Sequence, residues 1–397
     1  MSARVQIDAL EGFISPADDL GQLKLVDAAA VLNLAQEINK IDTQAQGKRK
    51  LTIILATGGT LAMRSSPDGV RTPALDVGFL IEKLPPELHD HFMVQGLQLF
   101  NVDSAQMSYQ HSRELAIVMT YLYRHIRIPF TGFLVMHGTD TMSYGAAAMS
   151  LMMGQGLPFS IVYTGAQRPI EEPLSDAPTN IRNALYTLES LYLREMAEVL
   201  IVMGDRAMLA TSSEKVDDAS VNAFAAPRHQ YVAQFTRMDY PVQLATWLKP
   251  RRSMPFEPTI IPGDYGHTLV IKSTLGYDPT LVERQVAIDT VRAVVLYSYG
   301  AGTVHERLLS ATMKAASLRD IPVFIVNPVH SGYRVEYLSN QKAIEAGAIP
   351  LDMTLSATLA KIEIALRLHG HHRQLLADFM TESYVGEVPS HDSRFVR

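Results

Sequence analysis

The sequence predicts an α/β fold, with a larger N-terminal domain on a mostly parallel, doubly wound sheet and a smaller C-terminal α/β domain. From Leu51 onward, short apolar runs alternate with longer segments of helical spacing, which is typical of parallel sheets. Three prolines between positions 247 and 258 interrupt this alternation, and it then resumes. We therefore expect four segments, which are an N-terminal extension with a helix and a linker (1–50), an N-terminal domain (51–246), a linker (247–265) and a C-terminal domain (266–397).

The first 50 residues precede the alternating pattern. Between Asp18 and Ile41, apolar residues such as Val31, Leu34 and Ile38 recur at helical spacing, which predicts a helix. The polar run at 42–50 then predicts a linker. This arm either packs on its own chain or a neighbouring subunit, or serves as a docking helix for another protein.

In the N-terminal domain, apolar runs predict buried strands and the segments between them have the spacing and length of helices. Methionines recur in the second of these helices, and we interpret them as core residues. Strands are expected at residues 51–56, 132–137, 159–164 and 198–203, and helices at 110–125, 141–155 and 178–194. The C-terminal domain is expected to hold strands at 268–272, 293–298 and 322–327, with helices at 303–318 and 356–368.

Composition excludes several classes of function. A net charge of −6 offers no basic surface for nucleic acid and no polybasic patch for a membrane. The absence of cysteine excludes disulfides and a cysteine nucleophile. No apolar run approaches the roughly 18 residues of a membrane span, and the N-terminus lacks a signal-like apolar core. These features predict a cytoplasmic protein.

The first strand ends in Thr57-Gly58-Gly59-Thr60. Two glycines allow a sharp turn and leave room for a ligand. Open parallel sheets bind ligands at the carboxyl ends of their strands. Thr60 is therefore either a turn residue or a nucleophile.

Three further polar segments have the same ambiguity. Gly138, Thr139, Asp140 and Thr141 follow the second predicted strand, where Asp140 or Thr141 would cap a helix or place a carboxylate beside a hydroxyl in a site. Asp103 and Ser104, taken alone, indicate only a loop. Lys215, taken alone, is a solvated lysine in a polar run.

Other catalytic patterns are absent from the sequence. No Gly-x-Ser-x-Gly elbow accompanies the 13 histidines, and the turn at Gly58 is not Gly-x-Gly-x-x-Gly. The histidine pairs at 89/91 and 371/372 lack a third ligand at metal-site spacing. We predict no metal and no cofactor.

Taken together, these segments resemble the bacterial asparaginase/glutaminase amidohydrolase family, and its cytoplasmic type I branch more than the periplasmic type II branch. Thr-Gly-Gly-Thr-Leu at 57–61 and His-Gly-Thr-Asp-Thr-Met at 137–142 match the two signature motifs in order and separation. Lys215 stands eight residues before Ala223-Phe224, as the family's catalytic lysine does. Residues 346–361 resemble the type I ending, and the likeness runs from about Leu51 to about Leu368.

The resemblance implies a role for each residue. Thr60 would attack the side-chain amide of L-asparagine or a related amide, forming an acyl-enzyme and releasing ammonia. Thr139, Asp140 and Lys215 would then activate the water that cleaves the ester. Four further residues would bind the substrate. The turns at Gly59 and Gly138 would supply N–H groups to the oxyanion, and Ser104 and Asp103 would hold the amino-acid head group. Family members need no metal or cofactor and form homodimers or homotetramers, with a neighbour's C-terminal domain near the site.

The sequence departs from the family pattern at several positions. The family has a tyrosine about ten residues after the nucleophile, but here Val70 or, with a one-residue shift, Arg71 stands there. No tyrosine precedes Tyr109. Other departures from the pattern occur at Ala105, Ala177 and Thr211.

Two alternative functions follow from these departures and from the N-terminal extension. One is a catalytically weak or inactive amino-acid-binding or regulatory protein on the same fold, which the missing tyrosine favours. The other is the asparaginase-like subunit of a tRNA-dependent amidotransferase, although residues 1–50 are short for its extra domain. Asparagine, glutamine and their D-enantiomers all stay open as substrates.

Overall fold

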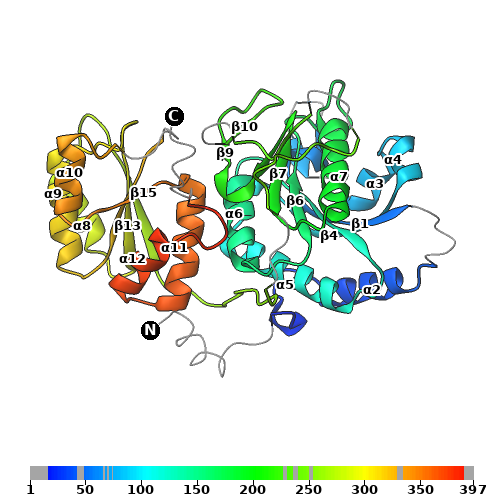
Figure 1. The fold of residues 1–397 in the computed structure, drawn as a ribbon, viewed down its shortest axis with the longest axis horizontal. Coiled ribbons are helices and arrows are strands. Elements are labelled where there is room, and N and C mark those ends of the chain that lie inside the picture. Colours follow the sequence, from blue (N-terminus) through cyan, green and yellow to red (C-terminus); the bar gives the residue numbers. More distant parts are fainter. Residues whose placement is uncertain are drawn as a thin grey trace. The chain divides into compact units, whose positions relative to one another are not determined.

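The computed structural model describes residues 17–42, 49–65, 68, 71–73, 75–226, 230–235, 240–249, 254–328 and 334–388, without the side chains at 65, 71 and 73. The chain divides into two compact units between Ile260 and Ile261. The positions of the two units relative to one another are not determined, so each is considered by itself (Figure 1).

The N-terminal unit contains a seven-stranded sheet in the order β11-β8-β7-β6-β5-β1-β4. Its strands are β1 (Lys50–Gly58), β4 (Phe92–Val102), β5 (Phe130–Met136), β6 (Ser160–Thr164), β7 (Val199–Met203), β8 (Arg206–Leu209) and β11 (Ala233–Gln234). The five strands from β7 to β4 run parallel, whereas β8 and β11 join antiparallel. The predicted α/β fold class is confirmed, and all four predicted strands are present.

Strand β4 is one that the sequence pattern does not predict. It lies at the edge of the sheet, and most of its residues are only half-buried. Gln95, Gly96 and Gln98 interrupt its apolar residues. An edge strand with this composition shows neither the continuous apolar run of a central strand nor a strict alternation.

The helices of this unit are α2 (Ala28–Asn39), α3 (Val77–Glu82), α4 (Pro86–His91), α5 (Tyr109–His125), α6 (Met142–Met153) and α7 (Ala177–Leu193). Helix α6 ends two residues before its predicted end because Gly154, at φ 69°, adopts a backbone conformation that terminates helices. The methionines of α6 are fully buried, which confirms that they are core residues.

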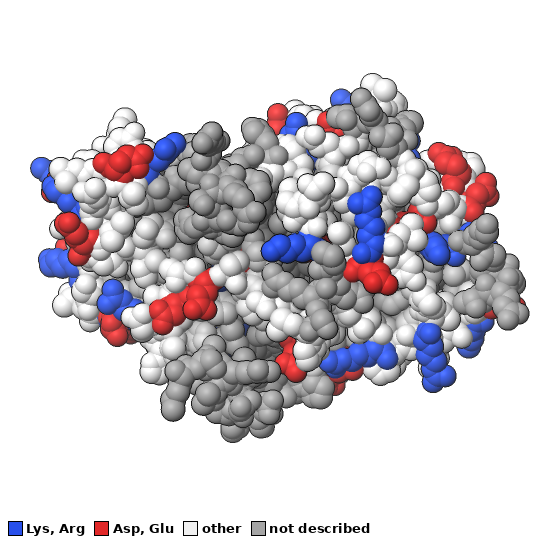
Figure 2. Space-filling model, in the orientation of Figure 1, with Lys and Arg blue, Asp and Glu red and all other residues white. Residues whose placement is uncertain are grey.

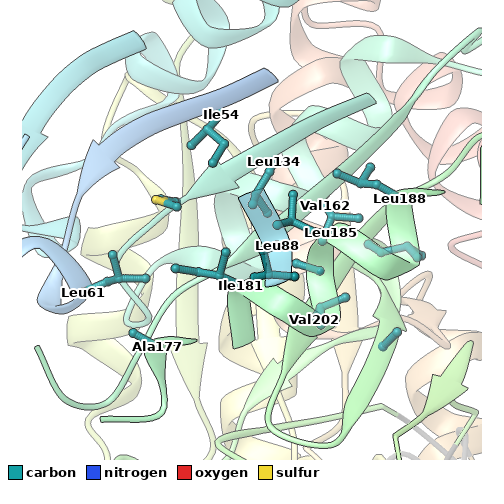
Figure 3. Packing of buried hydrophobic residues seen from close by; sticks show 14 of the residues in the cluster. Ile54, Leu61, Leu88, Leu134, Val162, Ala177, Ile181, Leu185, Leu188 and Val202 are labelled. Carbon is teal, nitrogen blue, oxygen red and sulfur yellow. The ribbon is translucent and has the colours of Figure 1, made fainter. Parts of the chain in front are cut away.

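Both faces of the parallel sheet are covered. Ile54 of β1, Leu134 of β5 and Val162 of β6 pack with Ile181 and Leu185 of α7 on one face (Figure 3). Side chains of successive strand residues point to opposite faces, and their neighbours, such as Ile53 and Phe133, are also fully buried. Such two-sided burial holds the ends of the central strands in fixed positions.

The N-terminal arm is fixed to α5 of its own chain. The buried carboxylate of Glu114 accepts hydrogen bonds from the backbone N–H groups of Lys24, Leu25 and Val26, at 2.8 to 3.0 Å. Helix α2 then packs on α5 and β4. It begins ten residues later than predicted because Asp27 caps it by accepting from Ala29 N–H.

The C-terminal unit is a four-stranded parallel sheet in the order β12-β13-β14-β15. Its strands are β12 (His267–Lys272), β13 (Val291–Tyr297), β14 (Val323–Val326) and β15 (Ile349–Leu351). Its helices are α8 (Pro279–Val286), α9 (Glu306–Ser317), α10 (Leu338–Glu345), α11 (Leu355–His369) and α12 (Arg373–Thr381). Lys361 of α11 forms a fully buried ion pair with Glu387, 2.6 Å apart.

Helices of the length and hydropathy that a bilayer requires are lacking among the described residues. On the face shown in Figure 2, basic and acidic side chains are interspersed on the described surface.

Candidate active site

Three strand ends are packed closely together at the carboxyl edge of the N-terminal sheet. Strand β1 pairs with both β4 and β5, and Gly59 N–H donates to Val102 O at 3.3 Å. A Cβ added to Gly59 would lie 2.3 Å from Gly138 Cα, and one added to Gly138 would lie 2.6 Å from Ser104 Oγ. Gly58 and Gly59 have φ of 105° and 86°, which favours glycine. The two glycine turns and Ser104 therefore pack without space for larger residues.

A cavity of about 320 Å³ opens at this edge. It is lined by Gly59, Thr60, Met63, Asp103, Ser104, Thr139, Asp140, Gln167, Lys215 and Asp218. The structure therefore brings seven of the eight predicted site residues to one cavity. The eighth, Gly138, is packed against two of the lining residues, Gly59 and Ser104.

Lys215 is held against Thr139 and Asp140, and we call these three residues the lysine triad. Its Nζ donates to Thr139 Oγ1 at 2.9 Å and pairs with Asp140 Oδ1 at 2.6 Å. The Lys215 side chain is 19% exposed, whereas that of Asp140 is 63% exposed. A short hairpin of β9 (Glu214–Lys215) and β10 (Phe224–Ala225) positions the lysine. The interpretation of Lys215 as a solvated lysine is therefore wrong.

The helix-cap interpretation of this turn is also wrong. Thr141 occupies the N-cap position of α6, but its hydroxyl donates to Ser104 O at 2.8 Å and makes no cap bond. Asp140 pairs with Lys215 instead. Both polar side chains thus connect the β5 turn to neighbouring segments.

Thr60 begins a short 3-10 helix at Thr60–Ala62, and its side chain is half-buried. Its hydroxyl makes no hydrogen bond to any other described residue. The predicted position of the missing loop tyrosine, Val70, lies outside the described residues. Arg71 is described only by its backbone, in strand β3 (Arg71–Pro73).

Asp103 and Ser104 differ in their exposure. Ser104 is buried at 4% exposure, and its backbone carbonyl accepts the Thr141 hydroxyl. Asp103 is exposed, and one of its oxygens accepts from Ala105 N–H at 2.9 Å. Its exposed carboxylate therefore retains acceptor capacity for a ligand.

His137 is buried directly after β5 and has a structural role. Its Nδ1–H donates to Gly138 O at 2.7 Å. Burial lowers the pKa of His137 to about 4. It is therefore neutral at pH 7, and it holds the backbone of the β5 turn.

Gln167 and Asp218 line the cavity but are not predicted from the sequence. Gln167 lies in the turn that follows β6, next to the exposed Arg168. Asp218 is an exposed residue of the polar run that contains Lys215. The only signal for either residue is its position next to a strand end or a motif residue.

Among the described residues, no group of three or more histidine or acidic side chains is arranged to hold a metal ion.

Comparisons with known proteins agree with this architecture. Residues 52–246 match the family model for the N-terminal part of asparaginase. The chain is similar to L-asparaginase of Thermococcus kodakarensis, with 29% identity over 346 residues that cover 85% of this chain and 98% of that protein. The crystal structure of L-asparaginase I from Vibrio cholerae superposes with a TM-score of 0.72 at 26% identity, covering 86% of this chain and 99% of that one.

A second kind of relative matches over a shorter stretch. It is a subunit of the glutamyl-tRNA(Gln) amidotransferase of Methanosphaera stadtmanae, 35% identical over 170 residues, which cover 42% of this chain and 36% of that protein. The relatives come from archaea as well as bacteria, so the likeness is not confined to bacterial proteins. Over residues 52–246, the chain is thus similar to the N-terminal part of asparaginases.

Proposed function

We propose that this protein hydrolyses the side-chain amide of L-asparagine, or of a related amino-acid amide, to the acid and ammonia through a threonine acyl-enzyme. The observation that carries the proposal is the lysine triad, which shares one cavity with Thr60. Two hydroxyls, a carboxylate and an ammonium ion at the ends of parallel strands form a site suited to acyl transfer. The similarity of residues 52–246 to the N-terminal part of asparaginase supports the same reaction class.

In the first half-reaction, Thr60 Oγ attacks the amide carbonyl carbon. The hydroxyl proton passes to the leaving nitrogen, the C–N bond breaks, and ammonia and a Thr60 ester remain. Backbone N–H groups of the Gly59 and Gly138 turns would stabilise the oxyanion, at roughly 3–4 kcal/mol per donor.

In the second half-reaction, water attacks the ester and restores the Thr60 hydroxyl. Lys215 can polarise Thr139 Oγ1, 2.9 Å away, and Asp140 keeps the ammonium ion in place. As water attacks, its proton would pass to Thr139 Oγ1, the Thr139 proton to Lys215 Nζ and one Nζ proton to Asp140 Oδ1. The proton returns through the same relay to Thr60 Oγ when the ester bond breaks. The products are the carboxylic acid and the free enzyme.

The charge of the cavity indicates what kind of substrate it favours. Among the described residues that line it, Asp103, Asp140 and Asp218 are acidic and Lys215 is the only cation. An excess of negative charge attracts the ammonium group of a free amino acid. Ser104 and the cavity N–H groups would hold its carboxylate.

The test is ammonia release from asparagine, glutamine and their D-enantiomers by wild type and Thr60→Ala. We expect the variant to lose activity at least a hundredfold. Thr57→Val is the matched control, because the Thr57 hydroxyl in the same turn donates to Met136 O at 3.1 Å and does not line the cavity. Ammonia release by Thr60→Ala at the wild-type rate would overturn the mechanism.

The same samples distinguish the alternatives. Calorimetric binding of asparagine without ammonia release would indicate a binding or regulatory protein. The similarity to the amidotransferase relative favours one further candidate, an ammonia-supplying subunit, which would require a partner and tRNA for activity. The proposal also includes a cytoplasmic location. It further includes assembly into a homodimer or homotetramer, and analytical ultracentrifugation would measure the mass of that assembly.

A further inference from the structure

Gln167 presents a hydrogen-bond donor that the proposed mechanism does not use. Its side chain lines the cavity beside the lysine triad. The Nε2 atom is buried, and no other described residue accepts a hydrogen bond from it. Buried amide groups almost always have partners, because losing hydration without a replacement is unfavourable. Because Nε2 has almost no exposed surface, rotation of the Gln167 side chain, which lines the cavity, would bring this unpartnered donor to a ligand oxygen.

The backbone that carries this side chain is held rigidly. Asp176 accepts from Gln167 N–H with both carboxylate oxygens, at 3.0 and 3.1 Å, and also from Arg168 N–H at 3.1 Å. Asn180 donates to Asp176 Oδ2 and to Gly165 O, each at 3.0 Å. The backbone of Gln167 is therefore fixed before a ligand binds.

The sheet order places Gln167 relative to the other site residues. Ser104 follows β4, Thr60 follows β1, Thr139 follows β5 and Gln167 follows β6, and these four strands are successive neighbours. Neighbouring strands lie roughly 4.8 Å apart. Gln167 is thus at the opposite end of the cavity from Ser104, with both threonines between them.

We propose that Gln167 is a specificity-determining residue that contacts the substrate. This inference rests on the proposed function, in which Ser104 and Asp103 hold the amino-acid head group. A substrate held there extends its side chain toward Gln167 and places its amide carbon at Thr60, which attacks it. Nε2–H then donates to the oxygen at the far end of that side chain, which in an amino-acid amide is the amide oxygen.

Such a contact would make kcat/KM depend on the length of the substrate side chain. Glutamine has one more methylene than asparagine, so the two amide oxygens cannot both reach Nε2 from the same head-group position. Sites built to pair with a polar group discriminate strongly against ligands that do not present it. Gln167 would therefore favour whichever of the two substrates fits.

The experiment compares kcat/KM for asparagine and glutamine in wild type, Gln167→Leu and Gln167→Glu. We expect Gln167→Leu to lower kcat/KM for the preferred substrate about tenfold and to reduce the preference at least threefold. Gln167→Glu should lower it further, because a carboxylate cannot donate to the oxygen. Gln106→Leu is the matched control, since Gln106 is exposed and does not line the cavity.

Values within twofold of wild type for both substrates would overturn the inference, as would equal losses for both. Binding of asparagine and aspartate by calorimetry separates this inference from the proposed function. If wild type releases no ammonia but binds either ligand, weaker binding by Gln167→Leu with an unchanged melting temperature still supports the contact. Unchanged binding would reject it.

Discussion

Gly59→Ala tests whether the close packing of two turns is what aligns the site. The new Cβ would lie 2.3 Å from Gly138 Cα and 2.4 Å from Gly138 N. Carbon atoms are in favourable contact at roughly 3.5–4.0 Å, so the β1 and β5 turns must separate by more than about 1 Å. Both contacts are with backbone, which no side-chain rotation relieves. Alanine at φ 86° adds strain of about 1–3 kcal/mol.

A displacement of about 1 Å between reacting groups costs about a hundredfold in rate, which corresponds to roughly 2.7 kcal/mol of activation free energy. We therefore expect kcat of Gly59→Ala to fall about a hundredfold in the ammonia-release assay, with a lower melting temperature. Gly145→Ala is the control. Gly145 lies within helix α6, and its added Cβ would be 3.4 Å from the nearest atom, His137 Nε2. It should retain activity within twofold and gain about 0.5–1 kcal/mol of stability. Wild-type kcat in Gly59→Ala would refute the claim that this contact sets the alignment.

Two further predictions concern buried ionisable groups. Lys361→Met should lower the free energy of unfolding by about 3–5 kcal/mol in urea titrations, because Glu387 would keep a buried, unpaired charge. The double variant Lys361→Met/Glu387→Leu should recover most of that loss, and no recovery would contradict a role for the charge. His137 makes stability depend on pH, since its folded pKa of about 4 lies below the value near 6.5 expected in the unfolded chain. The folded state binds fewer protons between these values, so stability is full above pH 6.5 and falls as the pH is lowered toward 4, by roughly 3 kcal/mol in total. In His137→Asn, whose amide can also donate to Gly138 O, unfolding between pH 4 and 7 should vary less with pH, and an unchanged pH dependence would assign it to other groups.

The fold class was predictable because central parallel strands are buried on both faces and therefore read as continuous apolar runs. Strand β4 lacks that signal since it is an edge strand with polar residues such as Gln95 and Gln98. The convergence of Thr60 and Thr139 was also predictable in physical terms. Parallel strands end at the same edge of the sheet, so polar turns that follow adjacent strands meet there.

Lys215 was not predictable from local physics. It lies 76 positions from Thr139 in the sequence, and a hairpin of only two residues in each strand positions it. Its polar surroundings in the sequence resemble a solvated loop, so only the family motif indicated its role. Gln167 was missed for a related reason. A glutamine after a strand end is unremarkable until its Nε2 is found buried at the cavity wall without a partner among the described residues.

The outcome at Asp140 and Thr141, where the site interpretation fits and the helix-cap interpretation does not, shows why local rules fail at this turn. Polar residues at the start of a helix usually cap it, at about 1 kcal/mol. Here Asp140 pairs with the Lys215 ammonium ion, and Thr141 donates to the backbone of Ser104. Instead of capping the helix that follows, each side chain makes a contact with a segment distant in sequence. We expect a functional role for a residue that does not form the local contact its sequence position favours and instead connects parts of one cavity.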